Sequence, residues 1–455
     1  MNEIDGLIFY NMVLNGYHNL VLNESNVNML NVFPVPDGDT GTNMRLTLEM
    51  GLSQSKDIKD ISLFSKALSR GMLIGARGNS GVILSQLFKG ISNGLKGYEK
   101  ADVVTFAKSL ISSYENAYEK IKSPKEGTIL TVAKEGLSRL VSRIDNNISF
   151  EQLLELVIEG MKKTLDKTPE ILPVLKDNGV IDSGGCGLVI IYEGMLKYLN
   201  GEIIPYVEKD VIKVTNTKFN NILNTFKKEG VVKEKNKNVS FIAVSTNSFF
   251  DEAFTNFGID VILDGNLNVS VKEFDDAIKS LNSKHIVILP NDKNSLLSCQ
   301  MAEEINIEKD IYIHPTKNPL EGYYSLFMFD PSSEDLDMQD VVSKMKQSTN
   351  NLTTILYSKS IKESKMNDVI IHKDDYIAIK DGEIVCADKN LEKTILDSLN
   401  KIDDVSIYES FGLFKDNNLD IDTDSLFEDF IDNNDLELYE FEMDDKDYIL
   451  MICLS

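Results

Sequence analysis

A glycine-rich loop near the N-terminus, NVFPVPDGDTGTNM at residues 31–44, places two aspartates two positions apart. Asp37 and Asp39 can converge on one hard cation if the chain turns between them, and Gly38 permits such a turn. Residues 40–43 then enter an expected helix, whose first backbone N–H groups have no partner within the helix and can bind a phosphate. The loop is therefore either a magnesium and phosphate site or a capped turn, because Pro, Asp and Gly are also the usual turn formers.

Two further loops of small residues precede expected helices, GARGNSG at 75–81 and DSGGCG at 182–187. In the first, small residues allow close approach to an anion and Ser80 adds a hydroxyl donor, although such residues also permit close helix packing. In the second, Asp182 can accept from a ribose hydroxyl or serve as an N-cap. Cys186 is expected to be a packed small residue, since no histidine neighbours it in sequence. Together with the aspartate pair, these loops indicate phosphoryl transfer from a magnesium nucleotide.

The loops interrupt a region of helical periodicity that covers residues 1–200. Apolar residues recur there at spacings of three and four, as in Ile61, Phe64 and Leu68. This spacing places them on one face of a helix. The pattern predicts an all-helical domain whose loops are gathered at helix starts.

The pattern changes after this region. Residues 201–238 end in the lysine- and asparagine-rich run FKKEGVVKEKNKN and are expected to be a linker. From 239 to 455 strand and helix patterns alternate, with strand-like runs VSFIAVST, IDVIL, HIVILP and DIYIHPT. This alternation predicts an α/β domain with a largely parallel sheet, and a break near residue 350 can divide it into two subdomains. Residues 376–387, YIAIKDGEIVCA, predict a β-hairpin with an Asp-Gly turn.

The composition bounds the class of protein. The 455-residue chain carries 47 basic and 72 acidic residues, a net charge of −25, which argues against a general nucleic-acid binder. Its four cysteines lie far apart, so we expect reduced thiols and not a disulfide or zinc framework. The N-terminus MNEIDGLIFYNMV lacks the positive charge of a signal peptide, and no apolar run reaches the roughly 18–20 residues of a membrane span. We therefore expect a soluble cytoplasmic protein with no integral membrane segment.

The three loops together resemble the L-type domain of dihydroxyacetone kinases and, more closely, the catalytic subunit of bacterial fatty acid kinase. The resemblance covers roughly residues 1–200 and implies a barrel of antiparallel helices that holds ATP and Mg²⁺ at one end. It also covers much of 239–455, where LPNDKN at 289–294 resembles the C-terminal signature Leu-Pro-Asn-Asn-Lys-Asn of the family, with Asp292 substituted. The implied fold is multidomain: a helical ATP- and Mg-binding kinase domain and a C-terminal α/β domain.

The resemblance assigns roles by position to residues of these loops. It implies that Asp37 and Asp39 are magnesium ligands and act in catalysis. It places the phosphates of ATP against one group of residues and the nucleoside towards another. The phosphate group is Thr40, Gly41, Thr42, Asn43, Met44, Ser80 and Gly81, and the nucleoside group is Thr128, Asp182 and Gly184.

Two departures from the family pattern affect this site. Dihydroxyacetone kinase domains carry a third acidic ligand five residues before the first aspartate, a register that falls here on Val32, with Asn31 beside it. Larger family members have a middle module with a His-x-His-Thr motif, whereas none of the four histidines of this chain forms His-x-His. We therefore interpret 201–238 as joining the N- and C-terminal modules directly, with the middle module absent.

The resemblance also implies the reaction. A fatty acid carboxylate is already ionised at neutral pH, so its attack on the γ-phosphorus of ATP needs no general base. We expect ATP- and Mg²⁺-dependent transfer to a fatty acid that a separate fatty-acid-binding protein presents, giving an acyl-phosphate for phospholipid synthesis. Two alternatives stay open, a nucleotide-binding regulatory protein without turnover and a dihydroxyacetone-type kinase subunit. A homodimer also stays open.

Features of the second half carry simpler predictions. His285 and His314 adjoin strand-like runs and are expected to have structural or surface roles. LPNDKN follows a strand-like run, where α/β sheets tend to place binding loops. The segment therefore predicts either a partner or ligand surface or an ordinary strand-to-helix turn.

Overall fold

A computed structural model describes residues 2–33, 37–138, 140, 148–207, 237–366, 368–419, 421–445 and 448–455. The chain divides into a helical unit that extends to Val214 and an α/β unit that follows it, with residues 270–272 grouped with the helical unit. Most of the expected linker, residues 208–236, lies outside the described residues. Among the residues described, no helix has the length and apolar character needed to cross a membrane.

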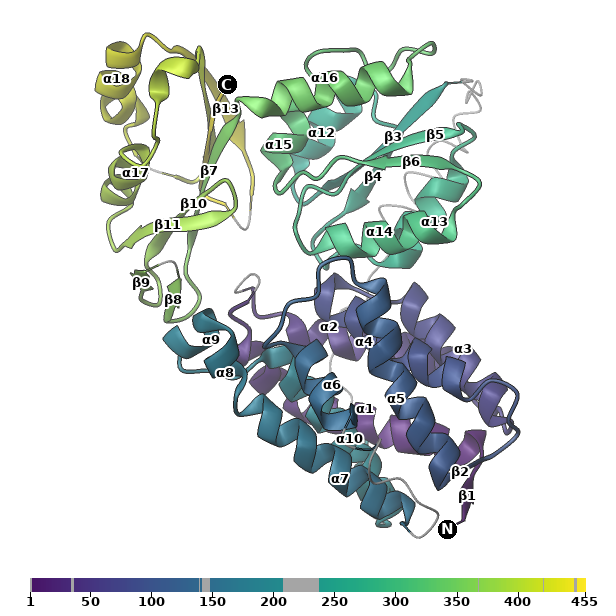
Figure 1. Ribbon diagram of the computed structural model, residues 1–455. Coiled ribbons are helices and arrows are strands. Elements are labelled where there is room, and N and C mark those ends of the chain that lie inside the picture. Colours follow the sequence, from purple (N-terminus) through teal and green to yellow (C-terminus); the bar gives the residue numbers. More distant parts are fainter. Residues whose placement is uncertain are drawn as a thin grey trace. The chain divides into compact units, whose positions relative to one another are not determined.

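The helical unit confirms the expected all-helical N-terminal region, apart from a short antiparallel pair of strands (Figure 1). Its helices are α1 (Gly6–Leu30), α2 (Thr40–Gln54), α3 (Ile61–Ile74), α4 (Gly78–Gly94), α5 (Val103–Lys120), α6 (Ile129–Ser138), α7 (Phe150–Leu165), α8 (Thr168–Ile171), α9 (Pro173–Asp177) and α10 (Ser183–Leu199), and its strands are β1 (Glu3–Ile4) and β2 (Ala101–Asp102).

Side-chain caps define where many of these helices begin. The caps are Asp5 of α1, Asp60 of α3, Asp102 of α5, Ser149 of α7 and Asp182 of α10, and each accepts a hydrogen bond from a backbone N–H of the first turn. Such a cap satisfies a donor that has no partner within the helix. These caps are therefore local sequence signals that fix the helix starts.

Close packing holds α1 along α10. A Cβ atom on Gly194 would lie 2.6 Å from Cα of Gly16, so the two helices approach within backbone contact. Phe9 of α1 packs against Phe64 and Phe106, with ring centroids 5.3 Å away in each case. The core of the unit therefore forms around α1.

The first part of the α/β unit contains a four-stranded parallel sheet among the described residues, in the order β4-β3-β5-β6. This confirms the predicted alternation of strands and helices. The elements are β3 (Val239–Ser245), α12 (Ser248–Phe257), β4 (Val261–Asp264), α13 (Val271–Ser280), β5 (His285–Leu289), α14 (Ser295–Ile305), β6 (Asp310–Ile313), α15 (Pro319–Tyr324) and α16 (Met338–Asn350).

The second part holds a mixed six-stranded sheet among the described residues, in the order β11-β10-β7-β14-β12-β13. The predicted hairpin is confirmed, since β10 pairs with β11 across Asp381 and Gly382, both at positive φ. Only β12 and β13 of this sheet pair in parallel among the described residues. The elements are β7 (Thr353–Lys359), β8 (Ser364–Met366), β9 (Val369–Ile371), β10 (Tyr376–Lys380), β11 (Glu383–Asp388), α17 (Leu391–Leu399), a 3₁₀ turn (Val405–Ile407), β12 (Ser410–Asp416), α18 (Thr423–Asn434), β13 (Glu437–Met443) and β14 (Leu450–Leu454).

An aromatic cluster joins the two parts of the α/β unit. Phe414 of β12 lies 5.5 Å from Phe249 of α12 and stacks on Phe441 of β13 at 4.6 Å, measured between ring centroids. Lys237, just before β3, is buried and donates to Asp260 Oδ1 at 2.8 Å and to the carbonyl oxygens of Gly258 and Pro331. Apolar packing and one buried ion pair therefore stabilise this unit.

Candidate active site

The starts of α2, α6 and α10 meet at one end of the helical unit. The Ser183 hydroxyl of α10 donates to Thr40 Oγ1 of α2 at 3.1 Å, and both residues are buried. A Cβ atom on Gly184 would lie 3.2 Å from Cβ of Ile129, the first residue of α6. The loops that sequence spacing singled out at residues 31–44 and 182–187 are therefore neighbours in space.

The start of α4 joins the same group. A Cβ atom on Gly81 would lie 2.4 Å from Thr47 Oγ1 and 3.3 Å from the carbonyl oxygen of Asn43, both on α2. Ser80 is half-buried beside Gly81 in the first turn of α4. Gly81 is thus needed for close helix packing, and this packing brings Ser80 to the start of α2.

Asn31 lies between the two aspartates. Its Nδ2 donates to Asp37 Oδ1 at 2.6 Å and is 3.4 Å from Asp39 Oδ1. Gly38 between them has φ of 68°, the left-handed conformation that glycine adopts readily. Val32 is buried and has no polar side-chain atom, so Asn31 and not Val32 is the residue that contacts the aspartate pair.

These side chains suit a hard cation in their chemistry. Carboxylate and amide oxygens are the ligand types that Mg²⁺ prefers, and Asp37 is exposed while Asp39 is half-buried. Among the described residues, no group of three or more His, Cys, Asp or Glu side chains is placed to hold a metal ion. A cation at this loop would therefore draw its charge compensation from the two aspartates and from bound phosphate.

The first amides of α2 are engaged within the unit. The backbone N–H groups of Gly41 and Thr42 donate to Asn28 Oδ1 of α1 at 2.7 and 3.3 Å. Met44 is fully buried, with its sulfur against Gly187 of α10. In this arrangement a phosphate would meet the loop through groups other than the Gly41 and Thr42 amides.

Asp182 connects the starts of α10 and α6. It is 5% exposed and accepts from the backbone N–H of Gly185 at 2.7 Å. Burial raises the pKa of its carboxyl group to about 6, although hydrogen bonds from the backbone of Gly185 and Ile129 oppose this rise. Thr128, which precedes α6, donates its hydroxyl to the carbonyl of Lys125 at 2.7 Å. Both side chains therefore have structural partners at the predicted nucleoside end.

Cys186 has the character of a packed residue. It is half-buried, and burial together with the charges of Asp182 and Glu193 raises the pKa of its thiol to about 11. A neutral thiol is a poor nucleophile. Cys186 therefore fills space beside the site, as the sequence predicted.

The LPNDKN segment forms a buried joint in the α/β unit. Asn291 donates through Nδ2 to the carbonyl oxygen of Val244 at 2.8 Å, and its backbone N–H donates to Thr316 Oγ1 at 2.9 Å. Asp292 accepts from the backbone N–H of Ser295 at 2.9 Å, at the start of α14. These bonds fit the strand-to-helix turn, and a partner or ligand surface at this segment stays a prediction.

The two histidines singled out in sequence have structural partners. Burial and the charge of Lys346 lower the pKa of His314 to about 4, so its ring is neutral at pH 7. His285 Nδ1 lies 2.8 Å from Asp310 Oδ2 on the neighbouring strand β6. Both observations agree with the structural and surface roles expected for these side chains.

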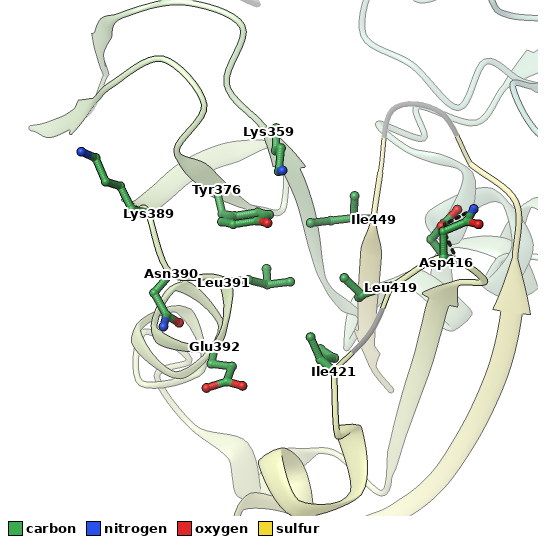
Figure 2. A pocket seen from close by; sticks show the side chains of 11 residues that line it. Lys359, Tyr376, Lys389, Asn390, Leu391, Glu392, Asp416, Leu419, Ile421 and Ile449 are labelled. Carbon is green, nitrogen blue, oxygen red and sulfur yellow. Dashed lines mark hydrogen bonds between the residues drawn. The ribbon is translucent and has the colours of Figure 1, made fainter.

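Figure 2 shows a cavity of about 590 Å³ in the α/β unit that the sequence did not reveal. Its lining comes from the ends of β7 and β10, the start of α17, and the segments that follow β12 and precede β14. The apolar lining residues are Tyr376, Leu391, Leu419, Ile421 and Ile449, and the polar ones are Lys359, Lys389, Asn390, Glu392, Asp416 and Asn418. Because acidic and basic side chains share its rim, the lining does not select a ligand by charge.

Comparison with known proteins defines the class. Residues 34–197 match the model of the DAK2 domain, and residues 240–454 match the model of the FakA-like C-terminal domain of fatty acid kinase. This combination defines a kinase-type protein with a helical unit and an α/β unit. The chain belongs to the FakA-like fatty acid kinase family, which confirms the resemblance seen in its sequence motifs.

Individual relatives extend over most of the chain. Protein YloV of Bacillus subtilis (strain 168) is 29% identical over 490 residues, which cover 86% of this chain and 88% of YloV. An uncharacterized protein of Staphylococcus aureus (strain USA300) is 28% identical over 497 residues, covering 88% of this chain and 90% of that protein. Among solved structures, the dihydroxyacetone kinase of C. freundii in complex with AMP-PNP and Mg²⁺ is 17% identical, with a TM-score of 0.31, and the match covers 44% of this chain and 35% of the kinase.

The lengths of these alignments bear on the middle module. An aligned region of 490 positions that includes only 86% of a 455-residue chain must contain many positions where YloV has residues and this chain has none. Residues 198–239 alone separate the two domain matches. Both observations agree with a chain that joins its N- and C-terminal modules directly.

Proposed function

We propose that this protein transfers the γ-phosphoryl group of Mg-ATP to the carboxylate of a fatty acid, giving an acyl-phosphate. The observation that carries the proposal is the aspartate pair, Asp37 and Asp39, beside Asn31 at the convergence of four helix starts. Membership in the FakA-like fatty acid kinase family supports the kinase class and the acyl substrate.

The residues have separate tasks in this proposal. Asp37 and Asp39 hold Mg²⁺, and Asn31 keeps their carboxylates together. The ion, when bound, neutralises charge on the phosphate oxygens. Ser80 contributes a hydroxyl donor to the phosphates, and Gly81 lets α4 approach closely enough for this contact.

Around that contact, the other predicted residues shape the site. Thr40 is held by Ser183, and Asn43 donates through Nδ2 to Asp39 Oδ2 at 2.8 Å. Asp182 and Gly184 fix the start of α10 towards the proposed nucleoside end, with Thr128 at the start of α6. Their task in the proposal is to keep the helix starts in position while nucleotide binds.

The acceptor explains why a base is not required. A fatty acid carboxylate is ionised at pH 7 and can attack phosphorus without losing a proton, so positioning and charge neutralisation are sufficient. A separate fatty-acid-binding protein is proposed to present this acceptor. With a net charge of −25, the chain favours a partner that offers a basic face.

One assay tests the proposal. The purified full chain is incubated with Mg-ATP and fatty acid, with and without a fatty-acid-binding protein, and acyl-phosphate is trapped with hydroxylamine. We expect acyl hydroxamate only with all components present, and a loss of two orders of magnitude or more in Asp37→Asn and Asp39→Asn, because each change removes a charged metal ligand. Asp166→Asn, which removes an exposed carboxylate after α7, is the matched control and should stay near wild type.

Other outcomes separate the alternatives. Phosphorylation of dihydroxyacetone without acyl-phosphate would favour the dihydroxyacetone-type kinase. Nucleotide binding without transfer to either acceptor would favour a regulatory protein that has lost turnover. Near-normal transfer by both aspartate variants would show that the metal site is wrongly assigned.

A further inference from the structure

The N-cap residue of α2 behaves differently from other aspartates at the same position. Asp5, Asp60, Asp102 and Asp182 each accept from the backbone N–H three residues later, as N-cap aspartates usually do. Asp39 is the N-cap of α2, yet within the described part of the chain its carboxylate makes no capping hydrogen bond. Its oxygens instead face side-chain amides: Oδ2 accepts from Asn43 Nδ2 at 2.8 Å, and Oδ1 lies 3.4 Å from Asn31 Nδ2.

A residue from another helix supplies the missing cap. Asn28 of α1 places Oδ1 at 2.7 Å from the Gly41 N–H and 3.3 Å from the Thr42 N–H. Gly41 and Thr42 are the second and third residues of α2, so these are the donors that an N-cap side chain ordinarily takes. Asn28 therefore occupies the acceptor position that the Asp39 carboxylate would otherwise fill.

A polar network holds Asn28 in this position. Its Nδ2 donates to Thr42 Oγ1 at 3.0 Å, and the Thr42 hydroxyl donates to Glu24 Oε1 at 2.8 Å. The other oxygen of the buried Glu24 side chain pairs with Nε of Arg45 at 3.2 Å. Glu24 and Asn28 are four residues apart on α1 and so share one face. The cap is thus fixed from both sides, by α1 and by the first turns of α2.

The backbone is shaped for this approach. A Cβ atom on Gly41 would lie 2.7 Å from the carbonyl oxygen of Glu24 and 2.9 Å from Asn28 Oδ1. Any larger residue would push α2 away from α1 and lengthen the bonds to Asn28. The glycine of the Asp-Thr-Gly-Thr run therefore serves the contact with Asn28.

We propose that Asn28 is a positioning residue that caps α2 in place of Asp39 and so keeps the Asp39 carboxylate directed at the metal. The inference rests on the proposed function, because it assumes that a divalent cation binds at Asp37 and Asp39. Without Asn28, the two open amides attract the nearest carboxylate, and an N-cap aspartate reaches them by rotation of its own side chain. The helix keeps a cap, and the cation loses a ligand.

Metal affinity and stability are measured separately to test this. The full chain is titrated with Mn²⁺ at a fixed ADP concentration, free Mn²⁺ is counted by electron paramagnetic resonance, and an ADP-only titration is subtracted. We expect Asn28→Ala to weaken Mn²⁺ binding by about 10- to 100-fold, the usual effect of losing a residue that orients a metal ligand. We expect its Tm to stay close to that of wild type, because Asp39 takes over the cap.

Two further variants make the test specific. Asn28→Asp keeps the acceptor for the Gly41 and Thr42 amides and should keep Mn²⁺ affinity. In an Asp39→Asn background, Asn28→Ala should cause no additional loss of affinity, since the carboxylate that Asn28 protects is already absent. Asp102→Ala, which removes an ordinary cap from α5, is the matched control and should lower Tm without changing Mn²⁺ affinity.

The outcomes distinguish this inference from the proposed function. If wild type binds Mn²⁺ and Asp39→Asn weakens binding, but Asn28→Ala lowers Tm and leaves affinity unchanged, the metal site stands and the positioning role is refuted. If Asn28→Ala weakens binding equally in the wild-type and Asp39→Asn backgrounds, the coupling to Asp39 is also refuted. If neither Asp39→Asn nor Asn28→Ala changes Mn²⁺ binding, the metal site of the proposed function fails together with the inference.

Discussion

Replacing Asp182 by asparagine should change how stability depends on pH. In the folded protein burial raises the pKa of this carboxyl group from 3.8 to about 6. Between these two values the folded state binds more protons at Asp182 than the unfolded state does. The free energy of unfolding therefore rises as pH falls through this window. The asparagine of the variant would not titrate, so this component should disappear.

The magnitude follows from the two pKa values. A difference between 3.8 and about 6 corresponds to about 3 kcal/mol when the full window is crossed. Between pH 7 and pH 4 most of this amount, about 2 kcal/mol, should appear as a gain of wild type relative to Asp182→Asn. The asparagine can still accept from the Gly185 N–H but loses one acceptor near the Ile129 N–H, which adds an offset that does not vary with pH. The dependence on pH is therefore the quantity to measure.

The assay must report on the helical unit, since the chain has two units that need not unfold together. Wild type and Asp182→Asn are equilibrated in urea at several pH values between 4 and 7, and pulsed hydrogen–deuterium exchange of peptides from α10 gives the unfolded fraction. Asp102→Asn is the control: hydrogen bonds from Thr105 lower the pKa of this exposed cap, so its contribution to stability is lost as pH falls, the opposite direction. A stability difference for Asp182→Asn that is constant across this range, or that shrinks towards pH 4, would refute the reasoning.

Three further changes test other parts of the structure. Gly194→Ala should destabilise the helical unit by about 2 kcal/mol in thermal unfolding, because its Cβ would lie 2.6 Å from Cα of Gly16; an unchanged Tm would contradict this packing. Lys237→Met should cost the α/β unit about 3 kcal/mol in urea unfolding, because it leaves Asp260 without its buried cation; a loss below about 1 kcal/mol would mean that the pair is dispensable. Cys186 should react with iodoacetamide at pH 8 about 100-fold more slowly than an ordinary thiol, since its pKa of about 11 keeps it protonated, and a rate like that of free cysteine would contradict its burial.

Local signals in the sequence were sufficient for much of the fold. The helical unit was predictable because apolar spacing and N-cap residues such as Asp60 and Ser149 act within a few residues. The parallel strands β3 to β6 were predictable because each is a short apolar run followed by a helix. The hairpin at Asp381 was predictable from its turn residues. In each case the deciding interactions lie close together along the chain.

The rest depends on contacts between distant residues. Asn28 and Glu24 lie in the middle of a helical pattern, where a polar side chain has the same periodicity whether it faces solvent or caps another helix. The register of the third acidic ligand pointed to Val32, but the turn of the loop leaves Asn31 facing the aspartates. The place of β14 between β7 and β12 depends on pairing over a long sequence separation, which no local pattern encodes.

This central position of β14 has a consequence for synthesis on the ribosome. Leu450–Leu454 pairs with β7 on one side and β12 on the other, so the middle of the six-stranded sheet stays open until these residues emerge. The described helices of the helical unit all precede residue 200, so that unit can fold while the rest is translated. Until then Thr353–Lys359 waits with an unpaired edge, and unpaired edges invite aggregation. A nascent chain stalled shortly before residue 450 should therefore carry a folded helical unit and an incomplete sheet that chaperones bind.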